Sequence, residues 1–305
     1  MARKHRHCMT RKSRLMEPTG DRTDLRALLE MPPWDWPSDA RLMFHKVLTD
    51  TNASESDRLV AAELAGDFTV IDDALSDALL GIVSSPGEPE AVRAAAAISL
   101  GPVLENADTS GFDDPDNCCI TERTFRRIQL ALHKLYPDAG IPKSVRRRIL
   151  EASVRSPQDW HGDAIRHAYS SGDRDWMLTA VFSMRWVRGF EDSILEALQS
   201  GDTDIQYEAI LAAGNWEMNA ALSHIVALVD AVYAPKRLRV AAIGAVGEIA
   251  PRNAGEILVD LTDSDDPEIA EAAADAIASA DVYANPYEDE DGDEDEEDDA
   301  GDWIH

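Results

Sequence analysis

The chain has 305 residues, of which 44% are hydrophobic and only 6% aromatic, with 58 acidic against 29 basic side chains and a net charge of −29. Setting aside the twelve acids of residues 288–302 and the six bases of residues 1–14 still leaves −23 for residues 15–287. A surface this acidic repels DNA phosphates, which argues against broad nucleic-acid binding.

The three cysteines, Cys8, Cys118 and Cys119, are too few and too badly spaced for a disulfide framework. They favour a reduced, cytoplasmic setting. Residues 1–16 are basic, but no apolar stretch of signal-peptide type follows them. No window approaches eighteen apolar residues, so we expect no membrane-spanning helix.

Residues 1–37 are expected to be irregular, because prolines surround Trp34 and Trp36 and forbid a regular helix. The ends of stacked helical repeats need a cover over their hydrophobic layer. We therefore expect the two tryptophans to pack this segment over the first helices as a cap.

From residue 38 onward, apolar residues recur at helical spacing and predict alternating first and second helices. Prolines and aspartates at the starts of several second helices, such as Pro89, Pro142 and Asp202, suit the first turn of a helix. The first helices are predicted at 38–49, 71–83, 121–135, 160–169, 190–199, 218–232 and 254–262. The second helices are predicted at 56–65, 90–100, 143–153, 174–186, 203–213, 236–249 and 267–279.

The second helices share a recurring sequence motif, which we call the phrase. It is clearest at Val92–Gly101 (VRAAAAISLG) and Leu238–Gly247 (LRVAAIGAVG). Its alanines predict close helix packing, with Ala95, Ala96, Ala241 and Ala242 buried. The second positions of its copies are Arg58, Arg93, Arg146, Met177, Gln206, Arg239 and Ala270, at spacings of 35, 53, 31, 29, 33 and 31 residues. A period near thirty in an apolar helical sequence indicates a solenoid of stacked helix pairs.

These residues, together with the run Asp266–Ile269 (DPEI), resemble HEAT repeats, including the phycobilisome-lyase type. The resemblance implies an all-α fold, an α-α superhelix of about seven helix pairs over residues 38–282. In that family, an Asp and the Arg at the second position commonly form ion pairs that link neighbouring repeats. We call this series of ion pairs the charge ladder. Arg58, Arg93, Arg146 and Arg239 match, whereas Met177, Gln206 and Ala270 depart. We therefore expect this charge ladder to be broken in the third and fourth gaps and at the C-terminal end.

Two segments fall outside the repeat pattern. The long spacing between the second and third copies predicts an inserted surface loop near 106–120, which is rich in Asp, Gly, Asn and Pro. Residues 283–305 include eleven carboxylates and one glycine between Glu288 and Asp299. Such a composition cannot bury an apolar core, so this tail is predicted to be disordered.

The sequence offers no enzyme motif. Some HEAT-like proteins are di-iron hydroxylases that carry His-Glu pairs, but no His-Glu pair occurs in this chain. The motifs typical of phosphate-binding loops and of nucleophile elbows are also lacking. We therefore predict a non-enzyme with no catalytic residues, no cofactor and no metal site.

One basic stretch stands out in this acidic chain, because residues 122–155 hold nine bases against three acids. On a helix pair these bases could form a patch for an anion or an acidic peptide. They could equally be a solvated face whose arginines pair with neighbouring repeats. The candidate patch consists of Arg123, Arg126, Arg127, Lys143, Arg146, Arg147 and Arg148.

A second candidate is aromatic, since Trp176, Trp186, Tyr207 and Trp216 concentrate in the fourth and fifth repeats. Trp186 and Trp216 fall near corresponding ends of consecutive second helices and could lie side by side. Tryptophan on a concave edge would anchor a protein partner. The alternative is that these rings fill the core where alanines are fewer.

The sequence therefore predicts a protein–protein interaction scaffold or adaptor with an unidentified protein partner. The alternative is a nucleic-acid-associated enzyme of the DNA glycosylase type, which would use the basic stretch 122–155. Nucleic acid is the less expected partner, because the body is acidic. The opposite charges of 288–299 and 123–155 also predict weak, salt-sensitive self-association.

Overall fold

The computed structural model describes residues 25–112 and 118–284. Within these ranges the chain forms sixteen α-helices and three short 3₁₀ helices (Pro33–Asp35, Asn219–Ala221 and Val259–Asp263), and no strand. The predicted all-α class is confirmed. Residues 1–24, 113–117 and 285–305 lie outside the described part, as do the expectations that rest on them.

The helices form the seven predicted pairs. The first helices are α2 (Ala40–Thr49), α4 (Asp73–Ser84), α7 (Glu122–Leu135), α9 (Asp159–Tyr169), α11 (Glu191–Ala197), α13 (Leu222–Asp230) and α15 (Pro251–Leu258). The second helices are α3 (Glu55–Leu64), α5 (Glu90–Ser99), α8 (Lys143–Ser153), α10 (Arg174–Ser183), α12 (Thr203–Asn215), α14 (Lys236–Ile249) and α16 (Pro267–Ala284). Each first helix packs on the second helix that follows it.

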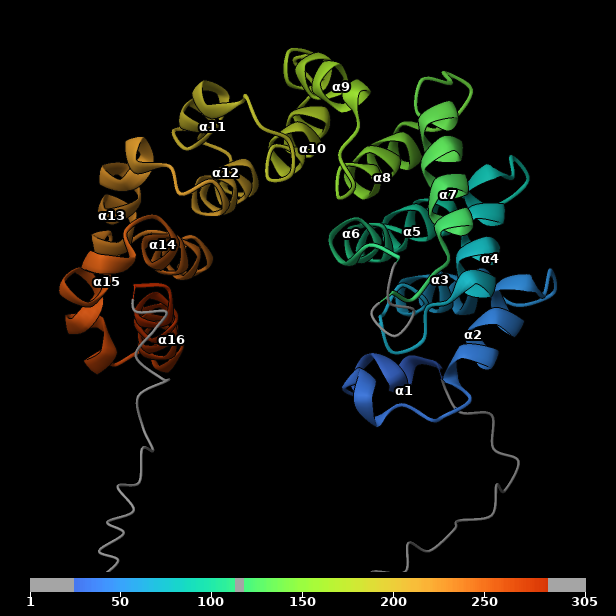
Figure 1. Ribbon diagram of the computed structural model, residues 1–305, viewed down its shortest axis with the longest axis horizontal. Helices are drawn as coiled ribbons and strands as arrows, with labels where there is room; N and C mark the ends of the chain where they lie inside the picture. The colour runs from blue at the N-terminus through green and yellow to red at the C-terminus, as the bar shows by residue number, and fades with distance from the viewer. Residues whose placement is uncertain (1–24, 113–117, 285–305) are drawn as a thin grey trace, which may run out of the picture.

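The pairs stack into an open arch (Figure 1). The second helices line its inner side and the first helices form its outer side, so the repeated phrase faces the concave surface. Helices α1 (Leu25–Leu29) and α16 stand at the two ends of the arch. This is the HEAT-like solenoid that the sequence predicted.

Three of the four alanines that were predicted to be buried are buried, and the prediction for Ala241 is wrong. Ala96 and Ala242 are completely buried and Ala95 is nearly so, whereas Ala241 is only half-buried. The glycine near the end of the phrase also has a packing role. A Cβ atom on Gly66 would lie 2.5 Å from the carbonyl oxygen of Ser99 in the next second helix. Consecutive second helices therefore approach closely where the phrase ends.

The arginine at the second position caps the helix that precedes it. Arg93 donates from Nη2 to the carbonyl of Val83 at 2.9 Å, and Arg146 donates from Nε to the carbonyl of Tyr136 at 2.7 Å. Arg58 and Arg239 bond in the same way to the carbonyls of Leu48 and Val229. The last carbonyls of a helix lack intrahelical partners, so each arginine ties the two helices of its own repeat together.

The charge ladder between repeats uses one of the predicted arginines together with other bases, and the expected breaks are wrong. Arg58 bonds Glu88, just before α5, at 2.5 Å across the first gap. A base in the first turn of a second helix pairs with acids at the start of the next second helix. Lys143 bonds Asp173 at 2.7 Å across the third gap, and Arg174 bonds Asp202 at 2.6 Å across the fourth. Lys236 bonds Asp266 at 2.9 Å at the C-terminal end. The ladder thus continues through all three places where a break was expected.

The N-terminal cover differs from the expectation in detail. Residues 25–29 form helix α1, although the whole of 1–37 was expected to be irregular. Trp36 packs edge-on against Phe44, with ring centroids 5.4 Å apart, and its Nε1 donates to the carbonyls of Leu28 and Met31. Trp34 is 79% exposed, so it is not part of the cap. One tryptophan, not two, joins this segment to the first helices.

The inserted segment and the C-terminal boundary also differ. Helix α6 (Gly101–Ser110) includes the first five residues of the expected loop. Pro102 lies in the first turn of α6, where its missing N–H costs nothing, so Gly101-Pro102 starts a helix as well as ending the phrase. At the other end, α16 runs two residues into the expected tail, because it continues to Ala284.

Candidate binding face on the inner side of the arch

The inner face is formed by residues four positions apart on each second helix, since such residues share one helix face. On α14 these positions are Val240, Gly244 and Glu248, which line an open hollow on the concave side. The equivalent positions are Leu178, Phe182 and Trp186 on and just beyond α10, and Tyr207 and Leu211 on α12. All five side chains are half-buried. We call these five residues the aromatic ridge.

Arginines stack on the aromatic rings of this region. The guanidinium carbons of Arg155 and Arg185 each lie 5.0 Å from the centroid of a Trp186 ring. Arg237 lies 3.7 Å above the ring of Tyr207. Cation–π contacts of this kind attract a cation to the ring face and hold the ring in place. Arg155 also pairs with Glu105 at 2.8 Å, and Arg237 pairs with Asp204 at 3.1 Å. The ridge is therefore an apolar strip whose rings are held in place by arginines.

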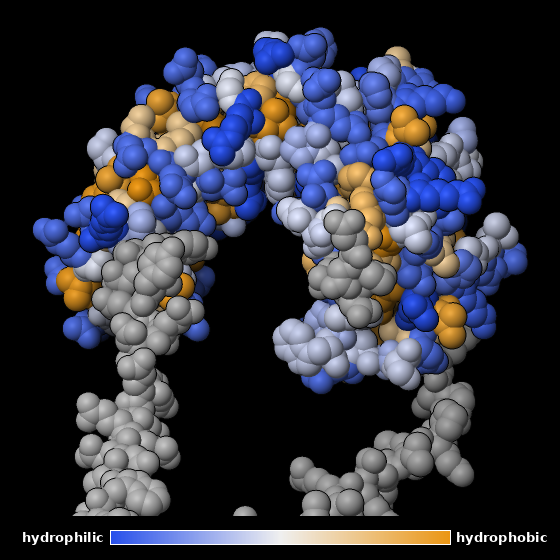
Figure 2. All heavy atoms as spheres, in the orientation of Figure 1, coloured by the Kyte–Doolittle hydropathy of each residue, from blue (hydrophilic) through white to orange (hydrophobic). Residues whose placement is uncertain are grey.

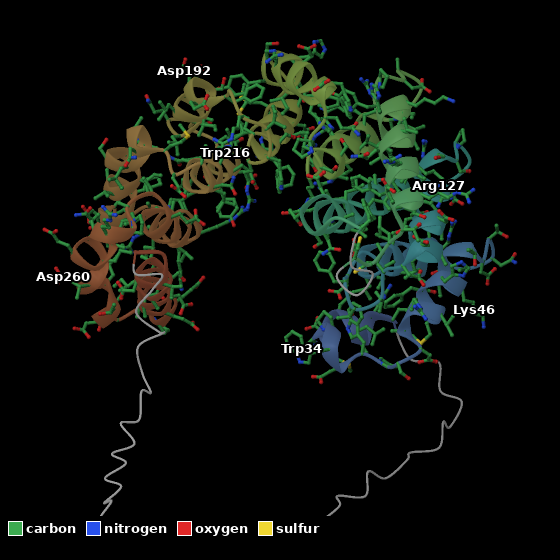
Figure 3. All side chains as sticks on the ribbon, in the orientation of Figure 1. Trp34, Lys46, Arg127, Asp192, Trp216 and Asp260 are labelled. Atoms are coloured by element: carbon green, nitrogen blue, oxygen red, sulfur yellow. The ribbon has the colours of Figure 1, made fainter. Side chains whose placement is uncertain are left out.

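The four predicted aromatic residues do not form one cluster. Trp176 contacts Tyr136 edge-on, with ring centroids 6.2 Å apart, and lies away from the ridge against the third repeat. Trp186 packs on Phe182 at 4.9 Å. Trp216 reaches back one repeat and donates from Nε1 to the carbonyl of Met184 at 2.7 Å (Figure 3). Trp186 and Trp216 therefore both lie at the junction between the fourth and fifth repeats, at the ends of α10 and α12.

Each of the four rings is half-buried, so the two interpretations of the sequence both apply in part. The rings fill space between repeats, and they also keep an exposed portion. Arg188 stacks 4.2 Å above the Trp216 ring. Trp186 and Tyr207 are the two members that belong to the ridge. Phe182, Leu178 and Leu211 were missed by the sequence analysis, although their four-residue spacing from Trp186 and Tyr207 was available to it.

The predicted basic patch is divided between two helices. Arg123, Arg126 and Arg127 lie on α7, on the outer side of the arch, where Figure 3 marks Arg127. Arg126 pairs with Glu122 on the same helix, and Arg127 pairs with Asp77 of α4. The side chains of Arg126 and Arg127 therefore already have anionic partners within the chain.

The remaining patch residues, all on α8, are engaged too. Lys143 pairs with Asp173 and Asp175, and Arg146 caps α7. Arg147 donates from Nε to Thr179 at 2.8 Å, and Arg148 bonds the buried Glu151 at 2.5 Å. The sequence analysis could not see these partners, because most of them lie about thirty or fifty residues away along the chain.

Two charged groups beside the ridge have unused hydrogen-bonding capacity. The Oε2 atom of Glu208 and the Nε atom of Arg185 are both inaccessible to solvent and have no hydrogen-bond partner within the described residues. Burial raises the pKa of the Glu208 carboxyl, while the charges of Arg185 and Arg237 oppose that rise. Buried polar atoms without partners are uncommon, so they mark places where a bound group could add a contact.

Among the described residues, the exposed large hydrophobic side chains of the outer side form no comparable strip. Along the outer rim of the arch, Figure 2 shows mainly hydrophilic side chains with hydrophobic ones between them. Leu42, Leu130 and Val232 are 67%, 70% and 73% exposed and come from different repeats. Single exposed hydrophobic residues of this kind are ordinary on protein surfaces.

Neither a metal cluster nor a membrane span is found in the part of the chain that the structure describes. Among those residues, no three His, Cys, Asp or Glu side chains are grouped so that they could hold a metal ion. None of the described helices has both the length and the apolar character that crossing a bilayer requires.

No protein-family model matches the chain. No curated protein matches it either. Among solved structures, human deoxyhypusine hydroxylase matches with 16% identity and a TM-score of 0.39, covering 84% of this chain and 89% of that one. YibA of Escherichia coli matches with 19% identity and a TM-score of 0.42, covering 83% and 85%. An engineered protein matches with 17% identity and a TM-score of 0.33, covering 81% and 98%.

Proposed function

We propose that the chain is a non-enzymatic scaffold that binds a protein partner on the inner face of the arch, with the aromatic ridge as its centre. The observation that carries this proposal is the row of half-exposed Leu178, Phe182, Trp186, Tyr207 and Leu211 on consecutive second helices. Aromatic residues with stacked arginines are the side chains that most often dominate protein interfaces. Solenoids commonly use their concave surfaces for binding.

The ridge also fits a partner because its rings are already ordered. Trp186 is held by Phe182, Arg155 and Arg185, and Tyr207 is held by Arg237. A side chain that is fixed before binding loses little conformational entropy when a partner arrives. The partner that suits this strip presents apolar side chains to the ridge and a carboxylate to Arg185, whose Nε has no hydrogen-bond partner within the described residues.

The alternative of a nucleic-acid-associated enzyme has less support. Six of the seven predicted patch residues are engaged within the chain, and part of the patch lies on the outer helix α7. A concave cradle for a duplex needs several free bases on the inner face, since each phosphate contact uses one.

The test is affinity capture from the cells that produce the protein, with paired variants. Trp186→Ala/Tyr207→Ala removes the two ridge rings, and Leu42→Ala/Leu130→Ala removes two exposed leucines of the outer face. We expect the ridge variant to lose its partner by about tenfold or more, as for interface hot spots. The outer-face variant should retain it. Equal capture by both variants, with their helical content unchanged by circular dichroism, would contradict the proposal.

A second arm addresses nucleic acid directly. Fluorescence anisotropy of a labelled DNA duplex should show no binding at moderate ionic strength. Duplex binding that weakens steeply with salt and is abolished by Arg123→Ala/Arg148→Ala would favour the glycosylase-type alternative instead.

A further inference from the structure

The inner face changes character in its last three repeats. Between the ends of α12, α14 and α16 lies an open hollow of about 750 Å³. Val240, Gly244 and Ala272 contribute a shallow, mainly apolar floor, and Glu217, Glu248 and Asp275 supply carboxylates. The residues that line the hollow include no lysine or arginine. We call it the acidic groove.

The three carboxylates of the acidic groove are exposed and have no ion-pair partner among the described residues. None of them takes part in a side-chain hydrogen bond within the described residues either. Burial raises the pKa of the Glu248 carboxyl, and the charge of Glu217 raises it further, while Arg185 opposes the shift. A cation placed in the groove would therefore relieve an existing repulsion, and the open floor above Gly244 leaves room for it.

A complementary segment exists in the same chain. Residues 1–14 contain six Lys or Arg and no acid, in a protein whose net charge is −29. They lie outside the described residues and precede α1, which stands opposite α16 across the open side of the arch (Figure 1). Beyond residue 16, no stretch of fourteen residues combines six bases with a complete lack of acids.

The length of this segment is sufficient. The bases lie between 11 residues (Arg14) and 22 residues (Arg3) before Leu25, so a fully extended chain carries them about 36–40 Å to about 73–79 Å from α1 at 3.3–3.6 Å per residue. The groove lies about five repeats from α1, or about 40–50 Å along the arch at 8–10 Å per packed layer. The direct path across the open side is shorter than the path along the arch.

We propose that the basic segment 1–14 docks in the acidic groove of its own chain. Docking would place bases of the segment against Glu217, Glu248 and Asp275, and the stems of its long side chains against the apolar floor. The contact is independent of whether an external partner binds the aromatic ridge. It would be weakened by salt, because its charges are near the surface.

Disulfide trapping in the full chain tests this proposal. Cys8 lies within the basic segment, and Cys118→Ser/Cys119→Ser leaves it as the single cysteine. Ser279→Cys adds a thiol at the groove, and Ser223→Cys adds a matched exposed thiol on α13 of the outer side. A mild oxidant then takes two electrons from each pair of thiols that meet, and the product is identified as monomer or dimer by mass.

We expect Cys8 to be trapped within the monomer by the Ser279→Cys thiol at low ionic strength, about tenfold faster than by the Ser223→Cys thiol. Glu217→Gln/Glu248→Gln/Asp275→Asn should remove this preference, whereas Asp230→Asn/Glu256→Gln/Asp260→Asn on the outer side should not. High salt applied to the unmodified groove should have the same effect as the groove variant, which keeps the test valid if that variant folds poorly.

The acidic tail is the competing binding partner of the basic segment, because it follows α16 close to Ser279 and carries eleven carboxylates at 288–299. Deleting residues 288–299 should leave trapping at position 279 intact. Loss of trapping on that deletion, equal trapping at positions 279 and 223, insensitivity to salt, or products that are only dimeric would each overturn the proposal.

Discussion

Thr179 on α10 donates a 2.6 Å hydrogen bond from Oγ1 to Oε1 of Glu151 on α8, and both side chains are almost completely inaccessible. Arg148 holds the other carboxylate oxygen, at 2.5 Å, and Arg147 donates to the Thr179 hydroxyl. The hydrophobic core is divided at this place into two clusters, which meet within α8. A polar bridge therefore joins the third and fourth repeats at the boundary between the two hydrophobic clusters.

Removing this bridge should destabilise the arch. Thr179→Val keeps the volume but leaves Glu151 Oε1 and Arg147 Nε without their partner, which should cost about 1–3 kcal/mol. Urea unfolding followed by circular dichroism measures the change. Thr109→Val, at an exposed position on α6, should change stability by less than about 0.5 kcal/mol. A Thr179→Val effect as small as that of the control would show that the bridge contributes little.

The glycines of the phrase allow a paired test. Gly66→Ala would place Cβ 2.5 Å from the Ser99 carbonyl oxygen, so α3 and α5 must move apart, at a cost of about 1–3 kcal/mol. Gly244→Ala meets no atom within 4 Å and lies inside α14, so it should stabilise by about 0.5–1 kcal/mol. Melting temperatures that shift in the same direction for both variants would contradict the packing described for consecutive second helices.

A third prediction concerns the alanines. Ala242 is completely buried in α14, so Ala242→Leu should overpack the layer and cost about 1–3 kcal/mol. Ala227 is exposed on α13, and Ala227→Leu should be close to neutral. Chemical denaturation of both variants checks this. A neutral Ala242→Leu would mean that the phrase does not pack in the observed orientation.

His161 should make stability depend on pH. Its Nδ1 accepts a hydrogen bond from the backbone N–H of Gln158, so Nε2 carries the proton that bonds Ser153. Burial lowers the pKa of His161 to about 3, and the charge of His133 adds to this. The unfolded state takes up a proton near pH 6.5, whereas the folded state does not until much lower pH. The stabilising contribution is therefore complete above pH 6.5 and is lost as the pH falls towards 3.

The measurement is the unfolding free energy between pH 6.5 and 4.5 for the parent and for His161→Gln, whose side chain can still accept and donate a hydrogen bond. The parent should lose up to about 1.4 kcal/mol per pH unit more than the variant. Parallel pH profiles would show that His161 is already charged in the folded state.

The repeat period was sufficient to predict the helix pairs. Each copy of the phrase specifies the buried face of one second helix, and its small residues allow that helix to pack closely on the next second helix. The start of α6 was missed for a local reason. Gly101-Pro102 both ends α5 and begins a new helix, and a sequence pattern does not distinguish these roles. The ion pairs across the third and fourth gaps and at the C-terminal end were missed because the expectation rested on the second position of the phrase. Their true signal was a base in the first turn followed, thirty residues later, by an aspartate.

The candidate sites were predicted less well, since they depend on contacts between distant residues. The basic count of 122–155 suggested a patch, but Arg127 pairs with Asp77 and Lys143 with Asp173, which no local charge count can reveal. Trp186 and Tyr207 were found because aromatic residues concentrate in the fourth and fifth repeats. The ridge that unites them with Phe182 required the knowledge that second helices face the inside of the arch.

Site-specific photo-crosslinking tests the central claim most directly. A photoreactive amino acid replaces Leu211 on the inner face in one version of the chain and Leu130 on the outer face in another, and irradiation is carried out in the producing cells. The account predicts a discrete crosslinked protein from position 211 that disappears with Trp186→Ala, and none from position 130. The same crosslinked protein from both positions, or a crosslink at 211 that is unaffected by Trp186→Ala, would contradict it.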